Sequence, residues 1–356
     1  MKIKEYGYEY DATLDQYLWE QTRGNVTQSQ LWGGICLRSG RDALKTIARE
    51  YEPAVVLMPA LSCDSMVLPF QMYGHQIYYY RLDKSYSIDV QFLEELINNN
   101  KKTILFLYMD YFGNSAITDD ELIELKTSYH NLIFIEDKTH SMIWERTNQF
   151  KPDYIVASLR KWINIPDGGL LWAKNLVSNT DFSEDTSFCE LRLKAQCMRN
   201  KYFLTGDENL KLEYRRIFSQ VSNIMDSDRV PSRMSSYAFE IARRTDWNIL
   251  REHRRRNSRE LINILTEASI KLIQKKEGVS DLYVAFVVDD REYKQKKLSS
   301  RGIFNTIIWP LKEKQKSVCP VSRFVGEHML AAPCDQRYCV EDMKYIGNEI
   351  VRVINE

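Results

Sequence analysis

Lys161 occupies a position at which lysine is uncommon, the end of an expected buried strand. Lys161 follows a strand-like apolar run over residues 154–158 and precedes the turn Pro166-Asp167-Gly168-Gly169. A lysine ammonium is strongly hydrated and is seldom buried without a partner. Burial lowers the pKa of the amine, and a neutral amine can attack a carbonyl carbon to form a Schiff base. We interpret Lys161 as a nucleophilic amine; a solvated lysine at the start of a surface loop is the alternative.

A second segment suits a bound anion. Ser39-Gly40-Arg41 precedes apolar residues that recur at helical spacing between positions 43 and 48. Backbone N–H groups at a helix N-terminus attract anions, and the missing side chain of Gly40 lets a phosphate approach closely. Arg41 would add a positive charge. The alternative is an ordinary helix start with Ser39 as its N-cap.

Polar clusters follow three of the apolar runs: Tyr111-Phe112-Gly113, Asp137-x-x-His140 and Ser158-x-x-Lys161. Ligands of open α/β sheets bind beyond the carboxyl ends of the strands. An acid, a strand-end lysine and an anion-binding helix start together predict pyridoxal 5'-phosphate as the ligand. The lysine would bond its aldehyde, the acid would keep its pyridine nitrogen protonated, and the helix start with Ser158 would hold its phosphate.

Composition narrows the class of protein. The chain has 356 residues, more than one hydrophobic core usually serves, and 44% of them are hydrophobic. The charge is balanced, with 49 basic and 49 acidic residues, so no polyanionic partner such as nucleic acid is indicated. No run of 18 apolar residues and no apolar signal core at the N-terminus occur, so we expect a cytoplasmic protein.

The seven cysteines include no C-x-x-C pair. Their odd number and spacing disfavour both a disulfide framework and a metal site. Reduced thiols are therefore expected.

Strand-like and helical segments alternate in the first half, which favours an α/β protein with a mostly parallel sheet between two layers of helices. The expected strands span residues 54–58, 76–80, 103–108, 132–135, 154–158 and 169–173, and the expected helices between them span 65–73, 90–97 and 119–129. No glycine-rich dinucleotide motif follows the first strand, and no P-loop is present, so neither of those nucleotide folds is indicated.

The motifs, taken in order, resemble the pyridoxal-phosphate aminotransferase superfamily of fold type I, and within it the sugar-aminotransferase branch called DegT/StrS. The matching segments are Ser39-Gly40-Arg41-x-Ala43-Leu44, Leu57-Met58-Pro59-Ala60, Tyr111-Phe112-Gly113, Ile135-Glu136-Asp137-x-x-His140-Ser141, Ser158-x-x-Lys161 with Gly168-Gly169, Gly302-Ile303 before Trp309-Pro310-Leu311, and Pro333-x-Asp335-Gln336-Arg337-Tyr338. The resemblance covers about residues 30 to 352. It rests on the order of the segments and on the 24 residues from Asp137 to Lys161, because no single motif is specific.

The resemblance implies a role for each site residue. Lys161 would carry the cofactor as a Schiff base, and Asp137 would pair with the pyridine nitrogen. His140 would lie beside the ring near its phenolic oxygen. Three catalytic residues are thus expected: Lys161, Asp137 and His140. The cofactor-binding set is Ser39, Gly40, Arg41, Cys63, Asp137, His140, Ser158 and Lys161.

This sequence departs from the branch at three places. Many sugar aminotransferases place an aromatic ring over the cofactor shortly after the proline that corresponds to Pro59, where this chain has Cys63 and no aromatic residue. Packing as a small apolar residue is the alternative for Cys63. Ser158 lies three residues before the lysine rather than the usual five, and Arg41 replaces a smaller residue. The departures bear on the substrate more than on the cofactor.

The resemblance also implies the domain organisation. We expect an N-terminal arm over residues 1–30, a large cofactor-binding domain over 31–235, and a small C-terminal α+β domain over 236–356 that begins with a connecting helix. One long helix is expected over residues 237–265. It contains the basic run Arg254-Arg255-Arg256, which we interpret as a solvated helix face rather than a nucleic-acid site.

The leading functional prediction is an aminotransferase. It would move an amino group from an amino acid donor, with glutamate expected, to a keto-sugar nucleotide or another small carbonyl acceptor. The second hypothesis is a pyridoxal-phosphate lyase, dehydratase or decarboxylase on the same fold. The third hypothesis is a diverged relative without activity. Retention of both Asp137 and Lys161 counts against the third.

A homodimer is implied by the resemblance. The aromatic-rich arm, which carries Tyr6, Tyr8, Tyr10, Tyr17 and Trp19, could cover a partner subunit. Packing of the arm within its own chain is the alternative.

Overall fold

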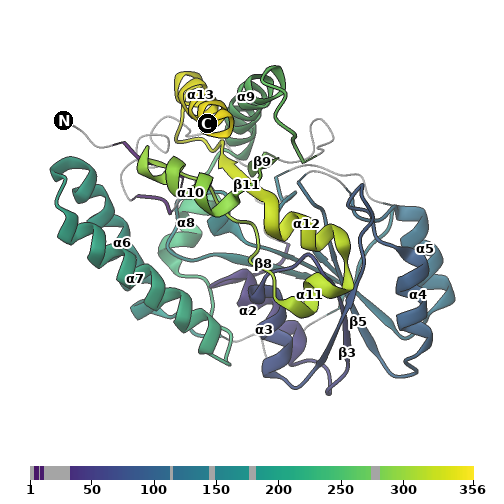
Figure 1. The fold of residues 1–356 in the computed structure, drawn as a ribbon. Coiled ribbons are helices and arrows are strands. Elements are labelled where there is room, and N and C mark those ends of the chain that lie inside the picture. Colours follow the sequence, from purple (N-terminus) through teal and green to yellow (C-terminus); the bar gives the residue numbers. More distant parts are fainter. Residues whose placement is uncertain are drawn as a thin grey trace.

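The computed structural model describes residues 4–7, 9–11, 33–112, 115–143, 149–175, 182–273 and 281–356. A seven-stranded sheet with the order β2-β8-β7-β6-β5-β3-β4 lies at the centre of the N-terminal half (Figure 1). Its strands are β2 (Ile35–Leu37), β3 (Val55–Pro59), β4 (Gln76–Tyr80), β5 (Ile104–Met109), β6 (Leu132–Asp137), β7 (Tyr154–Ala157) and β8 (Gly169–Ala173). Only β8 within this sheet runs antiparallel to its neighbours. The prediction of a mostly parallel sheet is therefore confirmed.

Helices cover both faces of this sheet. They are α2 (Gly40–Ala48), α3 (Asp64–Met72), α4 (Val90–Asn98) and α5 (Asp119–Ser128). Right-handed crossovers place α2 and α3 on one face and α4 and α5 on the other, because the chain reverses its direction across the sheet after β4 (Figure 1). Every residue of β5 is buried, as expected for a strand covered on both sides.

Two long helices follow the sheet and form an antiparallel hairpin, α6 (Thr186–Thr205) and α7 (Glu208–Ser227), which extends along one side of the molecule (Figure 1). Gly206 closes α6 in the left-handed conformation, with φ of 72°. The far end of α7 packs against α2 and α3.

The C-terminal part forms a smaller lobe above the sheet, in which α9 and α13 lie side by side (Figure 1). Its elements are α8 (Ser236–Arg244), α9 (Trp247–Glu267), β9 (Tyr283–Val287), α10 (Arg291–Ser300), β10 (Ile303–Phe304), α11 (Glu313–Val318), α12 (Pro320–His328), β11 (Met329–Pro333) and α13 (Val340–Asn355). Strands β9 and β11 pair antiparallel. A core of α9, α13, β9 and β11 side chains holds this lobe together.

The expected single helix over residues 237–265 is wrong. Thr245 is extended, with ψ of 129°, and ends α8. Asp246 then caps α9 by accepting hydrogen bonds from the backbone N–H groups of Asn248 and Ile249. A capping aspartate competes with a continuous helix, and apolar periodicity alone does not reveal that break.

The apolar residues over positions 305–309 likewise predict a strand, and that prediction is wrong. β10 ends at Phe304, and Thr306 makes only an isolated bridge to Ala331. Trp309 has a positive φ of 64°, which no strand residue adopts. This irregular path carries Trp309 from the small lobe into the site described below.

The described residues of the N-terminal arm pack within their own chain. Strand β1 (Tyr6–Gly7) pairs in parallel with β10, and the Tyr6 hydroxyl donates to Asp342 Oδ1 over 3.1 Å. The Tyr10 hydroxyl donates to the carbonyl oxygen of Trp162 over 3.2 Å. The other aromatic residues named for the arm, Tyr8, Tyr17 and Trp19, lie outside the described residues.

Close backbone contact between β8 and the start of α2 requires a glycine. A Cβ atom on Gly169 would lie 2.2 Å from the carbonyl carbon of Ser39 and 2.6 Å from the backbone nitrogen of Gly40. Such distances are far below van der Waals contact, and no flexible side chain is available to yield. Any side chain at position 169 would therefore displace the helix start.

We expect Gly169→Ala to lower the free energy of unfolding by about 3 kcal/mol or more, since overpacking against fixed backbone is destabilising. Urea unfolding followed by circular dichroism would measure the change. Gly33→Ala is the matched control, because nothing lies within 4 Å of a Cβ atom there. Equal stabilities of the two variants would contradict the close approach.

Candidate active site

The site lies at the carboxyl edge of the parallel strands, where the chain leaves β2, β3, β5, β6 and β7. Lys161 ends a short 3₁₀ turn, Leu159–Lys161, that follows β7, and its side chain is half-buried. Burial lowers the pKa of the Lys161 amine; Cys63 and Asp137 oppose this effect, while Arg160 and Arg41 add to it. The environment thus favours the neutral, nucleophilic form of the amine.

Asp137 is the last residue of β6, one strand away from the lysine loop. Register pairs it with Met109 of β5 and Val156 of β7, so the carboxylate sits in the middle of the edge. Its Oδ1 atom accepts a hydrogen bond from the backbone N–H of Thr139 over 2.8 Å. Burial raises the pKa of the Asp137 carboxyl, and Thr139 and Lys161 oppose the rise. A buried carboxylate of this kind is suited to a cationic partner.

Thr139 joins the two loops that carry the acid and the amine. Its hydroxyl oxygen accepts the backbone N–H of Ser158 over 3.2 Å, and its carbonyl oxygen accepts the indole N–H of Trp162 over 2.8 Å. Our sequence reasoning missed this residue. The signal available was its position two residues after an aspartate, a spacing at which the aspartate side chain commonly accepts the backbone N–H.

His140 is buried between aromatic rings from two parts of the chain. Its ring stacks on Trp309 with 5.4 Å between centroids and 17° between planes. The centroid of the Phe112 ring lies 5.8 Å from that of His140 and 6.3 Å from that of Trp309. Burial, together with a smaller effect of the Lys161 charge, lowers the pKa of His140 to about 3. His140 is therefore a neutral ring at physiological pH.

The predicted anion site is built as a capped helix start. Ser39 precedes α2, its hydroxyl oxygen accepts the backbone N–H of Asp42 over 3.2 Å, and the hydroxyl donates to Asp42 Oδ2 over 2.6 Å. A Cβ atom on Gly40 would lie 3.6 Å from Cβ of Ser158, so the loop after β7 borders the helix start. The structure thus places Ser39, Gly40 and Ser158 close together.

A buried arginine before this helix holds it in place. Arg38 is fully buried, and its guanidinium binds both oxygens of Asp42 over 3.1 Å each. It also reaches Asp185, the N-cap of α6, and Asp228, just after α7, at 2.8 Å each. The chain directly after β2 is therefore tied to the start of α6 and to the end of α7.

The Arg41 side chain points toward the end of α7. Its Nε lies 2.7 Å from Asp226 Oδ1, and Nη1 donates to the sulfur of Met225. Lys45, one turn further along α2, donates to the carbonyl oxygen of Met225 over 2.9 Å. Burial lowers the pKa of Arg41, and Asp226 opposes that effect. Arg41 remains close enough to Lys161 to affect the pKa of the amine.

Cys63 lies in the loop after β3 and precedes α3 without capping it through its side chain. Gln315 of α11 donates to the carbonyl oxygens of Ala60 and Ser62, over 3.1 and 2.8 Å. The buried hydroxyl of Tyr111 donates to the carbonyl oxygen of Leu61 over 2.8 Å. Nothing in the local sequence could identify Gln315, because it lies 253 residues from Ser62. All seven cysteines, each within the described part of the chain, are free thiols.

These residues fit pyridoxal phosphate. The start of α2 supplies backbone N–H groups beside Gly40, and the glycine at position 169 keeps the neighbouring backbone close without filling that space. A buried carboxyl and an amine with a lowered pKa lie on adjacent loops of the same edge.

Gly113 lies outside the described residues, as do residues 114 and 144–148.

The fold is similar to that of solved sugar aminotransferases of the DegT/StrS type. Spr1654 of Streptococcus pneumoniae, described as a sugar aminotransferase, superimposes with a TM-score of 0.66 over 100% of this chain and 98% of its own, at 14% identity. PseC of Helicobacter pylori gives 0.65 over 99% and 100%, at 14% identity. A DegT DnrJ EryC1 StrS aminotransferase of Brucella abortus gives 0.63 over 96% and 90%, at 16% identity.

No protein-family model matches the sequence. No curated protein matches it either. The likeness is therefore one of structure. Among the described residues, no helix has the length and hydrophobicity needed to cross a membrane.

We expect the Lys161 amine to lose its proton at a lower pH than an exposed lysine. Arg160→Gln should raise its pKa, because the Arg160 charge lowers it, whereas Asp137→Asn should lower it, because the carboxylate raises it. The rate at which apoprotein takes up pyridoxal phosphate, measured by absorbance against pH, reports the fraction of neutral amine.

Arg256→Gln, at an exposed site on α9, serves as the control for loss of an arginine charge. Rates that all reach half their maximum near pH 10.5, the ordinary lysine value, would contradict a lowered pKa.

Proposed function

We propose that this protein is a pyridoxal-phosphate-dependent aminotransferase that moves an amino group from an amino acid to a small carbonyl compound. The observation that carries the proposal is the placement of Lys161, with its lowered pKa, beside the buried Asp137 and next to the capped start of α2. A structural lysine gains nothing from such a position, because burial destabilises its charged form.

Each residue has a role in this proposal. Ser39, Gly40 and Ser158 hold the cofactor phosphate, and Arg41 adds positive charge nearby while it anchors α7. Asp137 pairs with the protonated ring nitrogen, and Thr139 orients its carboxylate through the 2.8 Å hydrogen bond. His140 would lie beside the cofactor ring as a neutral group, and Cys63, in the loop after β3, would lie near that ring. When bound, pyridoxal phosphate supplies an aldehyde that bonds the amine and a ring that accepts electrons.

Lys161 then acts as the base. Its amine would accept the α-proton of the donor and would hold it for return within the site, since attachment of the cofactor at this residue would keep the amine close to the reacting atoms. Burial lowers the pKa of the Lys161 amine, which favours the neutral form that such a base needs. The buried faces of His140, Trp309 and Phe112 exclude water from one side of the site.

A sugar substrate is supported by the proteins of similar structure. DesI, solved in the presence of its TDP-sugar product, has a TM-score of 0.65 at 13% identity. Spr1654 was solved in both PLP and PMP forms, the two states through which an amino group is relayed. For this chain we propose glutamate as the donor and a keto-sugar nucleotide, or another small carbonyl compound, as the acceptor.

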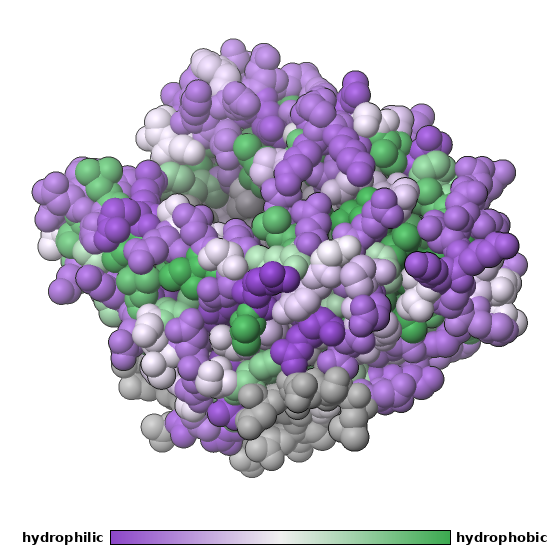
Figure 2. Space-filling view, turned by 90° about the horizontal axis from the view of Figure 1, so that it is seen from below, coloured by the Kyte–Doolittle hydropathy of each residue, from purple (hydrophilic) through white to green (hydrophobic). Residues whose placement is uncertain are grey.

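A homodimer is part of the proposal. Leu204 and Leu212, near the turn of the α6–α7 hairpin, are 63% and 69% exposed, and Val230 beyond α7 is 69% exposed. Figure 2 shows hydrophobic side chains in separate patches on the lower face, among largely hydrophilic residues. Such apolar side chains suit contact with a second copy. Light scattering at micromolar concentration should give the mass of two chains; a monomer mass would contradict it.

The covalent attachment of the cofactor is directly testable. Borohydride should fix pyridoxal phosphate to the peptide that carries Lys161, as measured by mass spectrometry. Lys161→Ala should abolish that adduct and lower turnover at least a hundredfold, because it removes both the attachment and the base. Arg160→Gln, at the adjacent residue, should keep the adduct. A persistent adduct on the same peptide of Lys161→Ala would refute the assignment.

The donor reaction separates amino transfer from elimination. Excess L-glutamate without any acceptor should convert the absorbance of the aldehyde form to that of the amine form and release one equivalent of 2-oxoglutarate. Asp137→Asn should still bind cofactor but lose activity by about a hundredfold or more, since its charge stabilises the ring cation. Release of ammonia or carbon dioxide with the aldehyde form retained would favour a lyase instead.

A further inference from the structure

The N-terminal arm contacts both neighbours of Lys161 in the chain. Arg160 precedes the lysine, and its Nη1 atom lies 3.4 Å from Glu9 Oε1. Trp162 follows the lysine, and its carbonyl oxygen accepts a hydrogen bond from the hydroxyl of Tyr10 over 3.2 Å. Glu9 and Tyr10 are consecutive in the arm, although they lie 151 and 152 residues from these partners in the sequence. Two successive arm residues thus bracket the amine.

The Glu9 carboxylate lies among arginines. It contacts Arg160 and also Nη2 of Arg192, an α6 residue that is 2% exposed. Burial raises the pKa of Glu9, but the surrounding arginine charges, those of Arg192 and Arg160 foremost, lower it below its usual value. The carboxylate is therefore ionised at neutral pH, and it offsets part of the charge of Arg160.

Tyr10 is held by the small lobe. Its ring is buried, and the guanidinium carbon of Arg337 lies 4.3 Å from the ring centroid. Its hydroxyl accepts a hydrogen bond from Nη2 of Arg254 over 2.8 Å. Arg337 also donates to the carbonyl oxygen of Glu9 over 3.0 Å. A tyrosine that is held at its face and at its hydroxyl has one orientation, so it meets the Trp162 carbonyl at a fixed place.

The carbonyl oxygen of Trp162 accepts hydrogen bonds from three separate parts of the chain. Besides Tyr10, Arg254 of α9 donates to it over 3.2 Å, and Gln336, in the loop after β11, donates over 2.8 Å. A carbonyl oxygen has two lone pairs, so three donors exceed its usual requirement. These contacts specify the position of the residue next to Lys161 as well as its burial.

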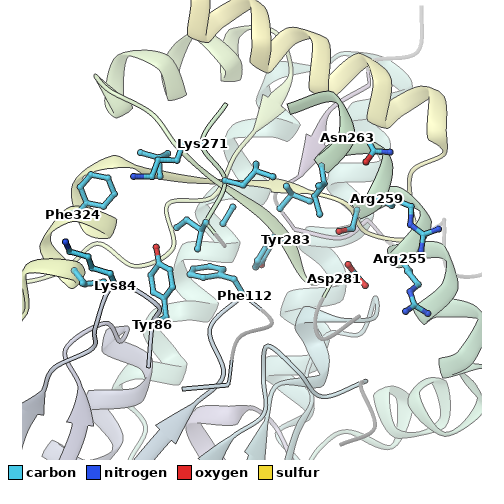
Figure 3. Close-up of a pocket in the computed structure, with 18 of the residues that line it drawn as sticks. Lys84, Tyr86, Phe112, Arg255, Arg259, Asn263, Lys271, Asp281, Tyr283 and Phe324 are labelled. Carbon is cyan, nitrogen blue, oxygen red and sulfur yellow. The ribbon is translucent and has the colours of Figure 1, made fainter. Parts of the chain in front are cut away.

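The three arginines of the basic run on α9 have different surroundings. Arg254 is 1% exposed, whereas Arg256 is exposed, so the expected solvated face is wrong for Arg254. Arg255 lines a large cavity between the small lobe and the sheet (Figure 3). The volume of this cavity is about 1070 Å³, and Phe112 lines it where it borders the site. Within the run, Arg254 is therefore the residue placed to act on the lysine loop.

Other contacts anchor the arm without the Glu9 carboxylate or the Tyr10 hydroxyl. Strand β1 pairs with β10, and the backbone N–H of Gly7 donates to the hydroxyl of Tyr338 over 2.6 Å. A partly buried charge and a buried hydroxyl beyond this anchor need another reason, because an apolar side chain would cover the same surface without the cost of desolvating a polar group.

We propose that Glu9 and Tyr10 are positioning residues for Lys161, Glu9 through Arg160 and Tyr10 through the carbonyl group of Trp162. Glu9 offsets the neighbouring positive charge, and Tyr10 holds the loop so that the amine keeps its half-buried place. The importance of the amine rests on the proposed function, whereas its placement by the arm does not.

Amine labelling of the full-length apoprotein tests the proposal. Acetic anhydride acetylates neutral amines, and mass spectrometry gives the rate at Lys161 as a function of pH. Lys45 on α2 is 1% exposed and serves as the reference in the same sample, because it is labelled when the fold opens. Cys63, Asp137 and Arg41 also affect the pKa of the Lys161 amine, and they are the same in every variant.

Glu9→Gln should raise the labelling rate of Lys161 about threefold at neutral pH. The Arg160 charge lowers the pKa of the amine, and this variant removes the carboxylate that offsets that charge. The same change in an Arg160→Gln background should have no effect, because Arg160 is the residue through which Glu9 acts.

Tyr10→Phe should raise the maximal labelling rate of Lys161, reached where all of the amine is neutral, by about twofold or more. Loss of one hydrogen bond to the Trp162 carbonyl loosens the loop and exposes the amine. Tyr10→Phe/Gln336→Met removes two of the three donors and should raise the rate further. The rate at Lys45 should stay at its wild-type value in each variant.

Two residues of the same arm provide matched controls. Glu5→Gln removes a carboxylate that binds Lys211, and Tyr6→Phe removes a hydroxyl that donates to Asp342. Both partners lie away from the lysine loop, so both variants should label Lys161 at the wild-type rate.

Glu9→Gln leaves the buried Arg192 without this counter-charge, which is destabilising. If that variant does not fold, Glu9→Gln/Arg192→Met removes both charges and should give the same rise at Lys161. Wild-type labelling of Lys161 in the Glu9 and Tyr10 variants would overturn the proposal. Equal rises at Lys161 and Lys45, or equal effects of the two arm controls, would also overturn it. Failure of the apoprotein to bind pyridoxal phosphate would refute the proposed function but would leave these labelling rates unaffected.

Discussion

The buried guanidinium of Arg38 is the interaction on which the arrangement of the site depends. It binds Asp42 inside the first turn of α2, Asp185 at the start of α6 and Asp228 after the end of α7. The carbonyl oxygen of Arg38 accepts the N–H of Gly168 over 2.6 Å, which ties β8 to the same point. A buried charge with one partner removed is strongly destabilising, so this set of partners specifies a single geometry. The start of α2 is thereby held at the carboxyl edge of the sheet.

The same edge places an acid and an amine in surroundings that shift their pKa values in opposite directions. Burial raises the pKa of Asp137 and lowers that of Lys161, and each group partly offsets the effect on the other. Thr139 sets their geometry, because it bonds to Asp137 on one loop and to Ser158 on the next. Two loops of different strands thus behave as one unit, which is what a reaction at a single cofactor requires.

The small lobe contributes to the site as well as to the cavity beside it. Trp309 and Gln315 reach from that lobe to His140 and to the loop after β3. The hydrophobic core around the large sheet accordingly includes Trp309 and Val325, from beyond the expected domain boundary at residue 235. The two lobes share packing, and Phe112 stands where the site, the cavity and the small lobe meet.

The sequence alone determined the local features. Short apolar runs bounded by turn residues located β4 and β8 at their observed ends and most other strands within two residues, because a buried strand needs a continuous apolar stretch. Ser39-Gly40 indicated the start of a helix, and Asp137 and Lys161 indicated the ends of two strands. Helix starts and strand ends could be predicted because they depend on residues that are neighbours in the chain.

Only the tertiary structure decided what depends on distant partners. The apolar pattern predicted a strand through Trp309 and a continuous helix through Asp246. Instead, Trp309 has a positive φ and Asp246 caps a new helix. Arg41 pairs with Asp226, which lies far along the sequence. No pattern in the residues around Arg41 indicates that pairing. Arg255 belongs to the basic run that we interpreted as a solvated helix face, whereas in the packed chain it lines a cavity together with residues of β9 and α12. Burial and charge pairing between remote segments are properties of the packed chain, and hydrophobic periodicity carries no information about which segments will meet.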